Sequence, residues 1–202
     1  MHITMKKHNL KVEYEATFSN INVDEMRTKI EQLGGKLLKP KFKQKRTTFN
    51  FPKGHEIKGG FIRVRDESGK ITMTLKIIES SGAIESQKEV ELIVDDYHNA
   101  IRLLKIIGAD QKAVQETKRE VWEIDGVEIM IDWWPFLEPI LEIEGRNEHE
   151  VKSIAEKLGF NWEEAIFDAV GYIYSQKYNI SIDRINNNTP EILFDMDNPF
   201  VD

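Results

Sequence analysis

The sequence contains no cysteine. This absence excludes a disulfide-stapled scaffold, a thiol nucleophile and a zinc site with cysteine ligands, and it fits a reducing compartment. The chain also lacks any apolar run of about 18 residues, the length that a membrane-spanning helix needs. Its first residues, MHITMKKHNL, have no apolar core long enough for a signal peptide. We therefore expect a soluble, cytoplasmic protein.

Basic charge is also scarce. The 28 Lys and Arg residues are outnumbered by 35 Asp and Glu residues, which leaves a formal net charge of −7. A nucleic-acid binder usually presents a basic face, so this balance argues against nucleic acid as a partner. Hydrolase elbows and phosphate-binding P-loops have no matching motif, and the five histidines are scattered without the spacing of metal ligands. The expected partner is therefore a small molecule, with neither nucleic acid nor membrane involved.

The pattern along the chain predicts one α+β domain. Its 202 residues, 40% of them hydrophobic, suffice for a core of its own. Alternating or β-rich segments predict strands over residues 10–18, 36–51, 61–67, 70–78, 86–94, 114–124, 127–134 and 139–145. Helical periodicity predicts helices over residues 23–35, 95–109, 147–160 and 167–180. We divide the chain into a flexible N-terminus (1–9), a single domain (10–180) and a poorly ordered C-terminal tail (181–202).

The predicted strands carry paired charges on one face. Glu142 and Glu144 are two residues apart, so their side chains point the same way, about 7 Å from each other. The same pattern recurs in Glu13 and Glu15, Arg63 and Arg65, Lys76, Glu89 and Glu91, Arg119, and Asp132. The opposite faces are apolar. If the helices cover these apolar faces from outside, the charged faces must line an interior.

A charged interior is costly unless it holds a charged ligand, because an unpaired buried charge costs several kcal/mol. Carboxylates bind divalent cations through hard oxygen ligands, whereas Arg and Lys bind phosphate oxygens. The combination suits a polyanion that carries its metal. Salt-bridge ladders between neighbouring strands are the alternative that the pattern leaves open.

The segments VEYEA, FIRVR, TLK, KEVEL, TKREVW and IDWWPFLEPILEIEG occur in this order. This series, from Leu10 to Tyr178, resembles the CYTH superfamily of triphosphate tunnel metalloenzymes, which includes class IV adenylate cyclases, thiamine triphosphatases and inorganic triphosphatases. The resemblance implies a closed eight-stranded antiparallel β-barrel, with helices packed outside, that binds a triphosphate or nucleotide together with Mg²⁺ or Mn²⁺. Dimers are common among such relatives, so a homodimer is one candidate state.

The resemblance also assigns roles to residues. Catalytic and metal-binding roles fall to Glu13, Glu15, Asp132, Glu142 and Glu144. Substrate-binding roles fall to Arg63, Arg65, Lys76 and Arg119, and Glu89 and Glu91 match a mid-chain acid pair whose role is less defined. Lys45 is a further substrate-binding candidate beside Arg46, and the sequence leaves open which of the two points inward.

Two positions depart from the family pattern. Thr17 and Thr117 stand where relatives usually have lysine, and Lys118 would face outward unless a β-bulge turns it in. These departures leave three activities open. Release of phosphate from an inorganic or organic triphosphate leads, and cyclisation of ATP to cyclic AMP and pyrophosphate or binding without turnover are the alternatives. The aromatic stretch 133–136 either packs at the tunnel or stacks on substrate, and we expect the last helix to close one tunnel end.

Overall fold

The computed structural model describes residues 10–79 and 82–201, so the predicted flexible segment 1–9 lies outside it. The strands are β1 (Lys11–Phe18), β2 (Lys36–Asn50), β3 (Gly60–Asp66), β4 (Ile71–Ile78), β5 (Gln87–Val94), β6 (Asp110–Ile124), β7 (Val127–Trp133), β8 (Ile140–Gly145) and β9 (Glu191–Ile192). The helices are α1 (Val23–Gln32), α2 (Tyr97–Ile106), α3 (Glu148–Leu158), α4 (Gly171–Tyr178) and α5 (Ile182–Asn187), with two short 3-10 turns, η1 (Ile84–Ser86) and η2 (Trp162–Glu164).

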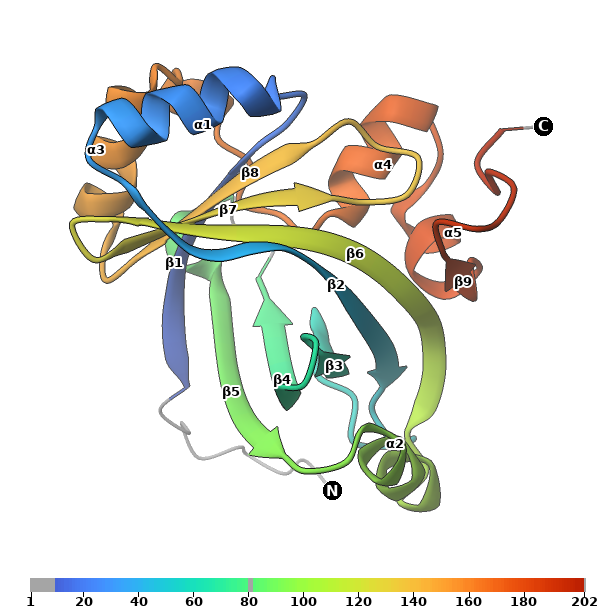
Figure 1. Cartoon of the computed structure of the whole chain (residues 1–202). Helices are drawn as coiled ribbons and strands as arrows, with labels where there is room; N and C mark the ends of the chain where they lie inside the picture. Colours follow the sequence, from blue (N-terminus) through green and yellow to red (C-terminus); the bar gives the residue numbers. More distant parts are fainter. Residues whose placement is uncertain (1–9, 80–81, 202) are drawn as a thin grey trace.

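Eight strands close into an antiparallel barrel (Figure 1). Their order around the barrel is β2-β3-β4-β5-β1-β8-β7-β6, and pairing of β2 with β6 completes the ring. These two strands are the longest, with 15 residues each, and they curve together across the molecule. The predicted fold, a closed eight-stranded antiparallel barrel with helices outside, is confirmed.

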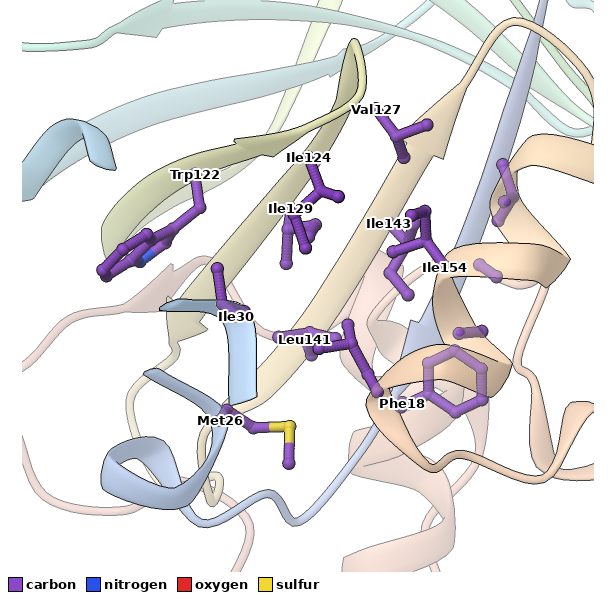
Figure 2. Close-up of a cluster of buried hydrophobic side chains, with 14 of the residues drawn as sticks. Phe18, Met26, Ile30, Trp122, Ile124, Val127, Ile129, Leu141, Ile143 and Ile154 are labelled. Carbon is purple, nitrogen blue, oxygen red and sulfur yellow. The ribbon is translucent and has the colours of Figure 1, made fainter. Parts of the chain in front are cut away.

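The main hydrophobic core lies outside the barrel, between strands and helices. The outward faces of β7 and β8 carry Ile129, Leu141 and Ile143, which are fully buried beneath α1 and α3 (Figure 2). Ile30 of α1 and Ile154 of α3 meet them from the other side. Because side chains alternate along a strand, burying these apolar faces outside turns the charged faces into the barrel.

The C-terminal segment is part of the folded structure, so the expectation of a poorly ordered tail was wrong. Helix α5 follows α4, and β9 pairs in parallel with β6. Ile185, Ile192 and Phe200 are buried together with Trp134 and Tyr174 in a second apolar cluster. These apolar residues are spaced too widely among polar ones to produce a helix or strand pattern, so the sequence did not reveal the docking.

This second cluster borders the barrel interior. The ring of Trp134 lies under the guanidinium of Arg46, with 4.5 Å between the Arg46 Cζ and the ring centroid. The hydroxyl of Tyr174 in α4 donates a hydrogen bond to the carbonyl oxygen of Pro135 at 2.6 Å. Helix α4 thus packs against Trp134 and Pro135 beside this part of the interior, and its closing of a tunnel end stays a prediction. None of the helices described is long and apolar enough to cross a membrane.

Candidate functional site

A cavity of about 330 Å³ lies inside the barrel, with side chains from all eight barrel strands in its wall. Ten of the predicted site residues line it: Glu13, Glu15, Arg63, Arg65, Lys76, Glu89, Glu91, Arg119, Glu142 and Glu144. The structure therefore brings together charges that lie up to 131 positions apart, from 13 to 144. The barrel closure produces this arrangement, since six strands contribute these residues and none contributes more than two.

Apart from Lys11 of β1 and Glu67 directly after β3, the lining charges on six of the strands are sorted by wall. Arg46, Arg63, Arg65 and Lys76 come from the adjacent strands β2, β3 and β4. The next three strands around the barrel, β5, β1 and β8, carry the acids Glu89, Glu91, Glu13, Glu15, Glu142 and Glu144. A basic wall thus faces and adjoins an acidic wall within one enclosed space. Such a cavity can hold an anion on one side and a cation on the other.

Two predicted residues do not line the cavity. Lys45 is exposed on the outside, so its predicted place in the site was wrong. Its neighbour Arg46 lines the cavity instead and is 7% exposed. The physical reason is the alternation of β2: Thr47 and Phe49 point outward to the α2 side, where the hydroxyls of Thr47 and Tyr97 lie 2.7 Å apart. Lys45 shares their face, and Arg46 has the opposite one.

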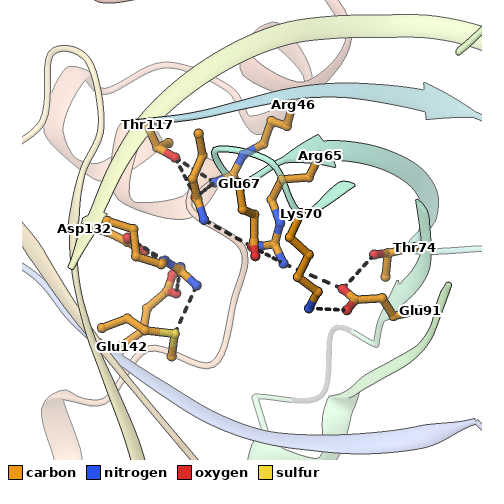
Figure 3. Close-up of polar contacts among 12 residues, drawn as sticks. Arg46, Arg65, Glu67, Lys70, Thr74, Glu91, Thr117, Asp132 and Glu142 are labelled. Atoms are coloured by element: carbon orange, nitrogen blue, oxygen red, sulfur yellow. Dashed lines mark hydrogen bonds and ion pairs between the residues drawn. The ribbon is translucent and has the colours of Figure 1, made fainter. Parts of the chain in front are cut away.

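Asp132 lies behind the cavity wall, fully buried. Its two carboxylate oxygens accept hydrogen bonds from the Nε and Nη2 atoms of Arg119, the first at 2.7 Å (Figure 3). The same Nη2 atom donates to Glu142 Oε2 at 2.5 Å. Burial opposes the charge of Arg119, but Asp132 and Glu142 outweigh it and raise the pKa of Arg119 well above its usual value. Asp132 therefore positions Arg119 in this structure.

The carboxylates of the acidic wall repel one another. Burial first, then the charges of Glu15 and Glu13, raise the pKa of Glu144 to about 7. Burial and Glu13 likewise raise the pKa of Glu89 to about 7. The pKa of Glu15 is raised by burial, against Lys76, with Glu142 adding to the rise. A bound cation would relieve this repulsion.

Two acids of this wall are already neutralised by bases. Lys76 Nζ lies 3.0 Å from Glu13 Oε2. Burial works against the charge of Glu13, and Lys76 prevails, so the pKa of Glu13 is lowered. Burial also works against the charge of Lys76, and Glu15 and Glu13 together raise its pKa. Glu142 is held by Arg119, as described above. Among the described residues, Glu15 and Glu89 form no ion pair, and Glu144 has only Lys11, whose Nζ lies 3.7 Å away and whose side chain is mostly exposed.

The residues present fit a divalent cation. Within residues 10–79 and 82–201, no three metal-binding side chains stand ready as a complete site. Mg²⁺, however, usually needs only one or two carboxylates and takes its other oxygens from water and substrate phosphates. Glu15 and Glu144 are direct neighbours across the β1–β8 pair and offer two such carboxylates. The donor set thus fits Mg²⁺ or Mn²⁺ arriving with a phosphate chain.

The two threonines that replace family lysines have different surroundings. Thr117 is fully buried, accepts a hydrogen bond from Arg46 Nη2 at 2.9 Å and donates one to Gln44 Oε1 at 2.9 Å. Thr17 lies opposite Glu142 in the β1–β8 pair, and its backbone is paired with Ile166. Lys118 lies outside with its Nζ 4.4 Å from the ring centroid of Phe194, so no bulge turns it inward.

Sequence reasoning missed several lining residues. Glu67 and Lys70 flank the β3–β4 turn, where Glu67 Oε1 lies 2.8 Å from Arg65 Nη2 (Figure 3). Leu38, Lys39, Phe42, Val121, Glu128 and Met130 complete much of the wall on the β2–β6–β7 side. The turn and the irregular register of β2 with β6 hid these positions, because alternation cannot be extended across a register shift.

Comparison with known proteins agrees with this geometry. The sequence profile of the CYTH domain matches residues 12–169. The chain belongs to the CYTH family. A search of curated proteins finds no match.

Solved structures share the CYTH fold. The PH1012 protein of Pyrococcus horikoshii is 25% identical, with a TM-score of 0.65 over 78% of this chain and 96% of its own. A candidate adenylate cyclase of Vibrio parahaemolyticus is 12% identical, with a TM-score of 0.70 over 83% of this chain and 99% of its own. A candidate adenylyl cyclase of Hippeastrum, described as having a dominant triphosphatase activity, is 12% identical. Its TM-score is 0.53 over 85% of this chain and 99% of its own. At 12% identity, the latter two likenesses concern the fold alone.

Proposed function

We propose that this CYTH protein is a metal-dependent triphosphatase that releases phosphate from an inorganic or organic triphosphate inside the barrel. The observation that carries the proposal is the sorting of charge, with a basic wall from β2, β3 and β4 beside an acidic wall from β5, β1 and β8. A triphosphate bound with a divalent cation matches both walls at once. A simple anion would leave the acids unpaired, and a simple cation would leave the arginines unpaired.

The basic wall binds the phosphate chain. Arg63 and Lys76 are buried and face the cavity, and Arg65 lines it two residues further along β3, on the side of Arg63 away from Lys76. Burial and the charge of Arg63 lower the pKa of Arg65 to about 10, which still leaves it protonated at neutral pH. Charged hydrogen bonds from these groups to phosphate oxygens are stronger than neutral ones, and Arg can make two in parallel.

The acidic wall holds the cation. Glu15 and Glu144 are the proposed ligands of the cation. Glu13 and Glu142 lie in the same wall, and they become available to the cation when their basic partners, Lys76 and Arg119, bind the phosphate instead. A bound Mg²⁺ or Mn²⁺ would neutralise phosphate charge and supply an acidified water. Asp132 keeps Arg119 oriented toward the cavity, where its guanidinium stabilises the charge that develops on the leaving phosphate.

Adenylate cyclase is the second candidate. Leu38, Phe42, Val121 and Met130 form an apolar strip in the cavity wall on the β2–β6–β7 side. This strip offers a surface for the organic part of a nucleoside triphosphate, which an inorganic chain does not need. With ATP so placed, a ribose hydroxyl in place of water would give cyclic AMP and pyrophosphate.

A product assay tests the proposal. Purified protein is incubated with inorganic triphosphate, thiamine triphosphate or ATP, each with Mg²⁺ and with Mn²⁺, and all products are separated. Glu144→Gln serves as the site variant, and Lys45→Gln is the matched control because Lys45 is exposed outside the barrel. Orthophosphate from the wild type and the control, but not from Glu144→Gln, supports the triphosphatase.

Other results point elsewhere. Cyclic AMP with pyrophosphate would establish the cyclase instead. Tight binding without any product would make the protein a triphosphate-binding module and reject both enzymatic proposals. In that case Thr17→Lys restores the charge that relatives carry, opposite Glu142, and turnover gained by this variant would identify the missing base.

A further inference from the structure

Arg46 of β2 is a buried guanidinium in the cavity wall without a carboxylate partner. Its Nη2 donates to the neutral acceptors Gln44 Oε1 at 3.1 Å and Thr117 Oγ1 at 2.9 Å. Its Nε atom is buried and has no hydrogen-bond partner among the residues that the structure describes. The remaining contact is with the ring of Trp134. Nothing in this set cancels the positive charge.

Three other cations of the cavity are neutralised by acids. Arg65 pairs with Glu67, Lys76 with Glu13, and Arg119 with Asp132 and Glu142. Across the described ranges, Arg46 and Arg63 are the buried lining bases that form no ion pair. An uncompensated buried charge is strongly unfavourable for folding. Its presence in a ligand cavity therefore indicates that a bound ligand compensates it.

The surroundings of Arg46 make the charge still less favourable. Burial first, and then the like charges of Arg63, Arg65 and Arg119, lower the pKa of Arg46 well below its usual value. Four guanidinium groups therefore act on one another across the cavity. An anion that enters between them would relieve this repulsion.

Gln44 and Thr117 hold Arg46 in one orientation. They are direct partners in the β2–β6 pair, and the Thr117 hydroxyl donates to the same Gln44 Oε1 that accepts from Arg46 (Figure 3). Gln44 is held in turn by Glu67, whose Oε1 accepts from Gln44 Nε2 at 3.2 Å. Neutral groups fix the guanidinium without pairing its charge, and its remaining N–H groups stay available for a ligand.

We infer that Arg46 is a substrate-binding residue whose guanidinium seats a phosphate of the substrate in the barrel, oriented by Gln44 and Thr117. This inference rests on the proposed function. The threonine at 117 is part of the arrangement, because a longer side chain there would fill the space that the Arg46 guanidinium occupies at 2.9 Å.

The test measures binding of inorganic triphosphate to the metal-free protein by calorimetry. Arg46→Gln should raise the dissociation constant about 10- to 100-fold, the loss expected for a charged hydrogen bond. Lys45→Gln changes the neighbouring residue, which faces outward and does not contact the cavity. The dissociation constant of this variant should stay within about twofold of the wild-type value. Glutamine keeps donors and acceptors for Gln44 and Thr117, so the variant should fold.

Two further readouts separate binding from a structural role. Removal of a repelled charge should leave the melting temperature of Arg46→Gln equal to or above that of the wild type. Thr117→Lys added to Arg46→Gln places an ammonium beside the vacated position and should recover about tenfold or more of the lost affinity. A lower melting temperature with no recovery would make Arg46 a structural residue and overturn the inference.

Arg63→Ala distinguishes failure of the inference from failure of the proposed function. If the wild type binds and Arg63→Ala weakens binding while Arg46→Gln does not, Arg46 is not a phosphate ligand and the triphosphate site stands. If the wild type binds triphosphate neither in the metal-free state nor with Mg²⁺ added, or Arg63→Ala binds as tightly as the wild type in both conditions, the proposed function itself is rejected.

Discussion

Replacement of Glu144 by glutamine should stabilise the metal-free protein at alkaline pH. Burial and the neighbouring acids raise the pKa of Glu144 from 4.5 to about 7. The folded protein therefore keeps a proton that the unfolded chain releases between these two values. Since the folded state binds more protons there, the free energy of unfolding falls as pH rises from 4.5 to about 7, and above pH 7 the whole penalty is present.

The magnitude follows from the shift. The difference between 4.5 and about 7, at about 1.36 kcal/mol per unit, amounts to about 3 kcal/mol. The side chain is 28% exposed, and solvent screening reduces the effect, so about 1–3 kcal/mol is expected. Glutamine has nearly the same shape and no charge in either state. The free energy of unfolding of Glu144→Gln should thus exceed that of the wild type by this amount at pH 8 and equal it near pH 4.5.

Chemical denaturation with a chelator present, followed by tryptophan fluorescence, measures the difference at both pH values. Glu31→Gln on the exposed side of α1 is the matched control and should change stability equally at both. Added Mg²⁺ at about 100 times its dissociation constant should stabilise the wild type by about 2.7 kcal/mol, and the variant by less. Equal stability of wild type and Glu144→Gln at pH 8 would refute the picture of a strained acidic wall.

Three further predictions concern the two walls and the docked tail. Glu142→Gln should raise the metal concentration needed for half-maximal turnover about 10- to 100-fold, and an unchanged titration would argue against a contribution of Glu142 to the metal site. Arg63→Ala should weaken triphosphate binding by about 1.5–3 kcal/mol, measured by calorimetry against Lys45→Ala, and equal affinities in both variants would count against the basic wall. Ile185→Ala, at a site 2% exposed in α5, should lower the free energy of unfolding by about 2–5 kcal/mol in urea without changing triphosphate affinity. A cost below about 0.5 kcal/mol would mean that α5 contributes little to the fold.

Local periodicity predicted the strands and the charged face of most of them, and the resemblance to the CYTH superfamily added the closed barrel. Dyads such as Glu13 with Glu15 and Glu142 with Glu144 fall on one face because side chains alternate with a period of two. The structure places helices α1 and α3 over the apolar opposite faces of β7 and β8, and the charged faces of these strands therefore point inward. The sequence thus determined the closed barrel, the charged interior and the membership in the CYTH family.

Tertiary structure decided what periodicity could not. The direction of Arg46 and Lys45 depended on Thr47 and Phe49 meeting α2, a contact between elements far apart in the chain. The pairing of Asp132 with Arg119 became visible only when β6 and β7 lay side by side.

Contacts between distant segments also decided the position of the C-terminal tail. Ile185, Ile192 and Phe200 carry no periodic pattern, yet they share one buried cluster with Trp134. Alternation is a property of each strand alone, whereas pairing, burial and the sorting of charge into two walls arise from the order in which the strands close the barrel.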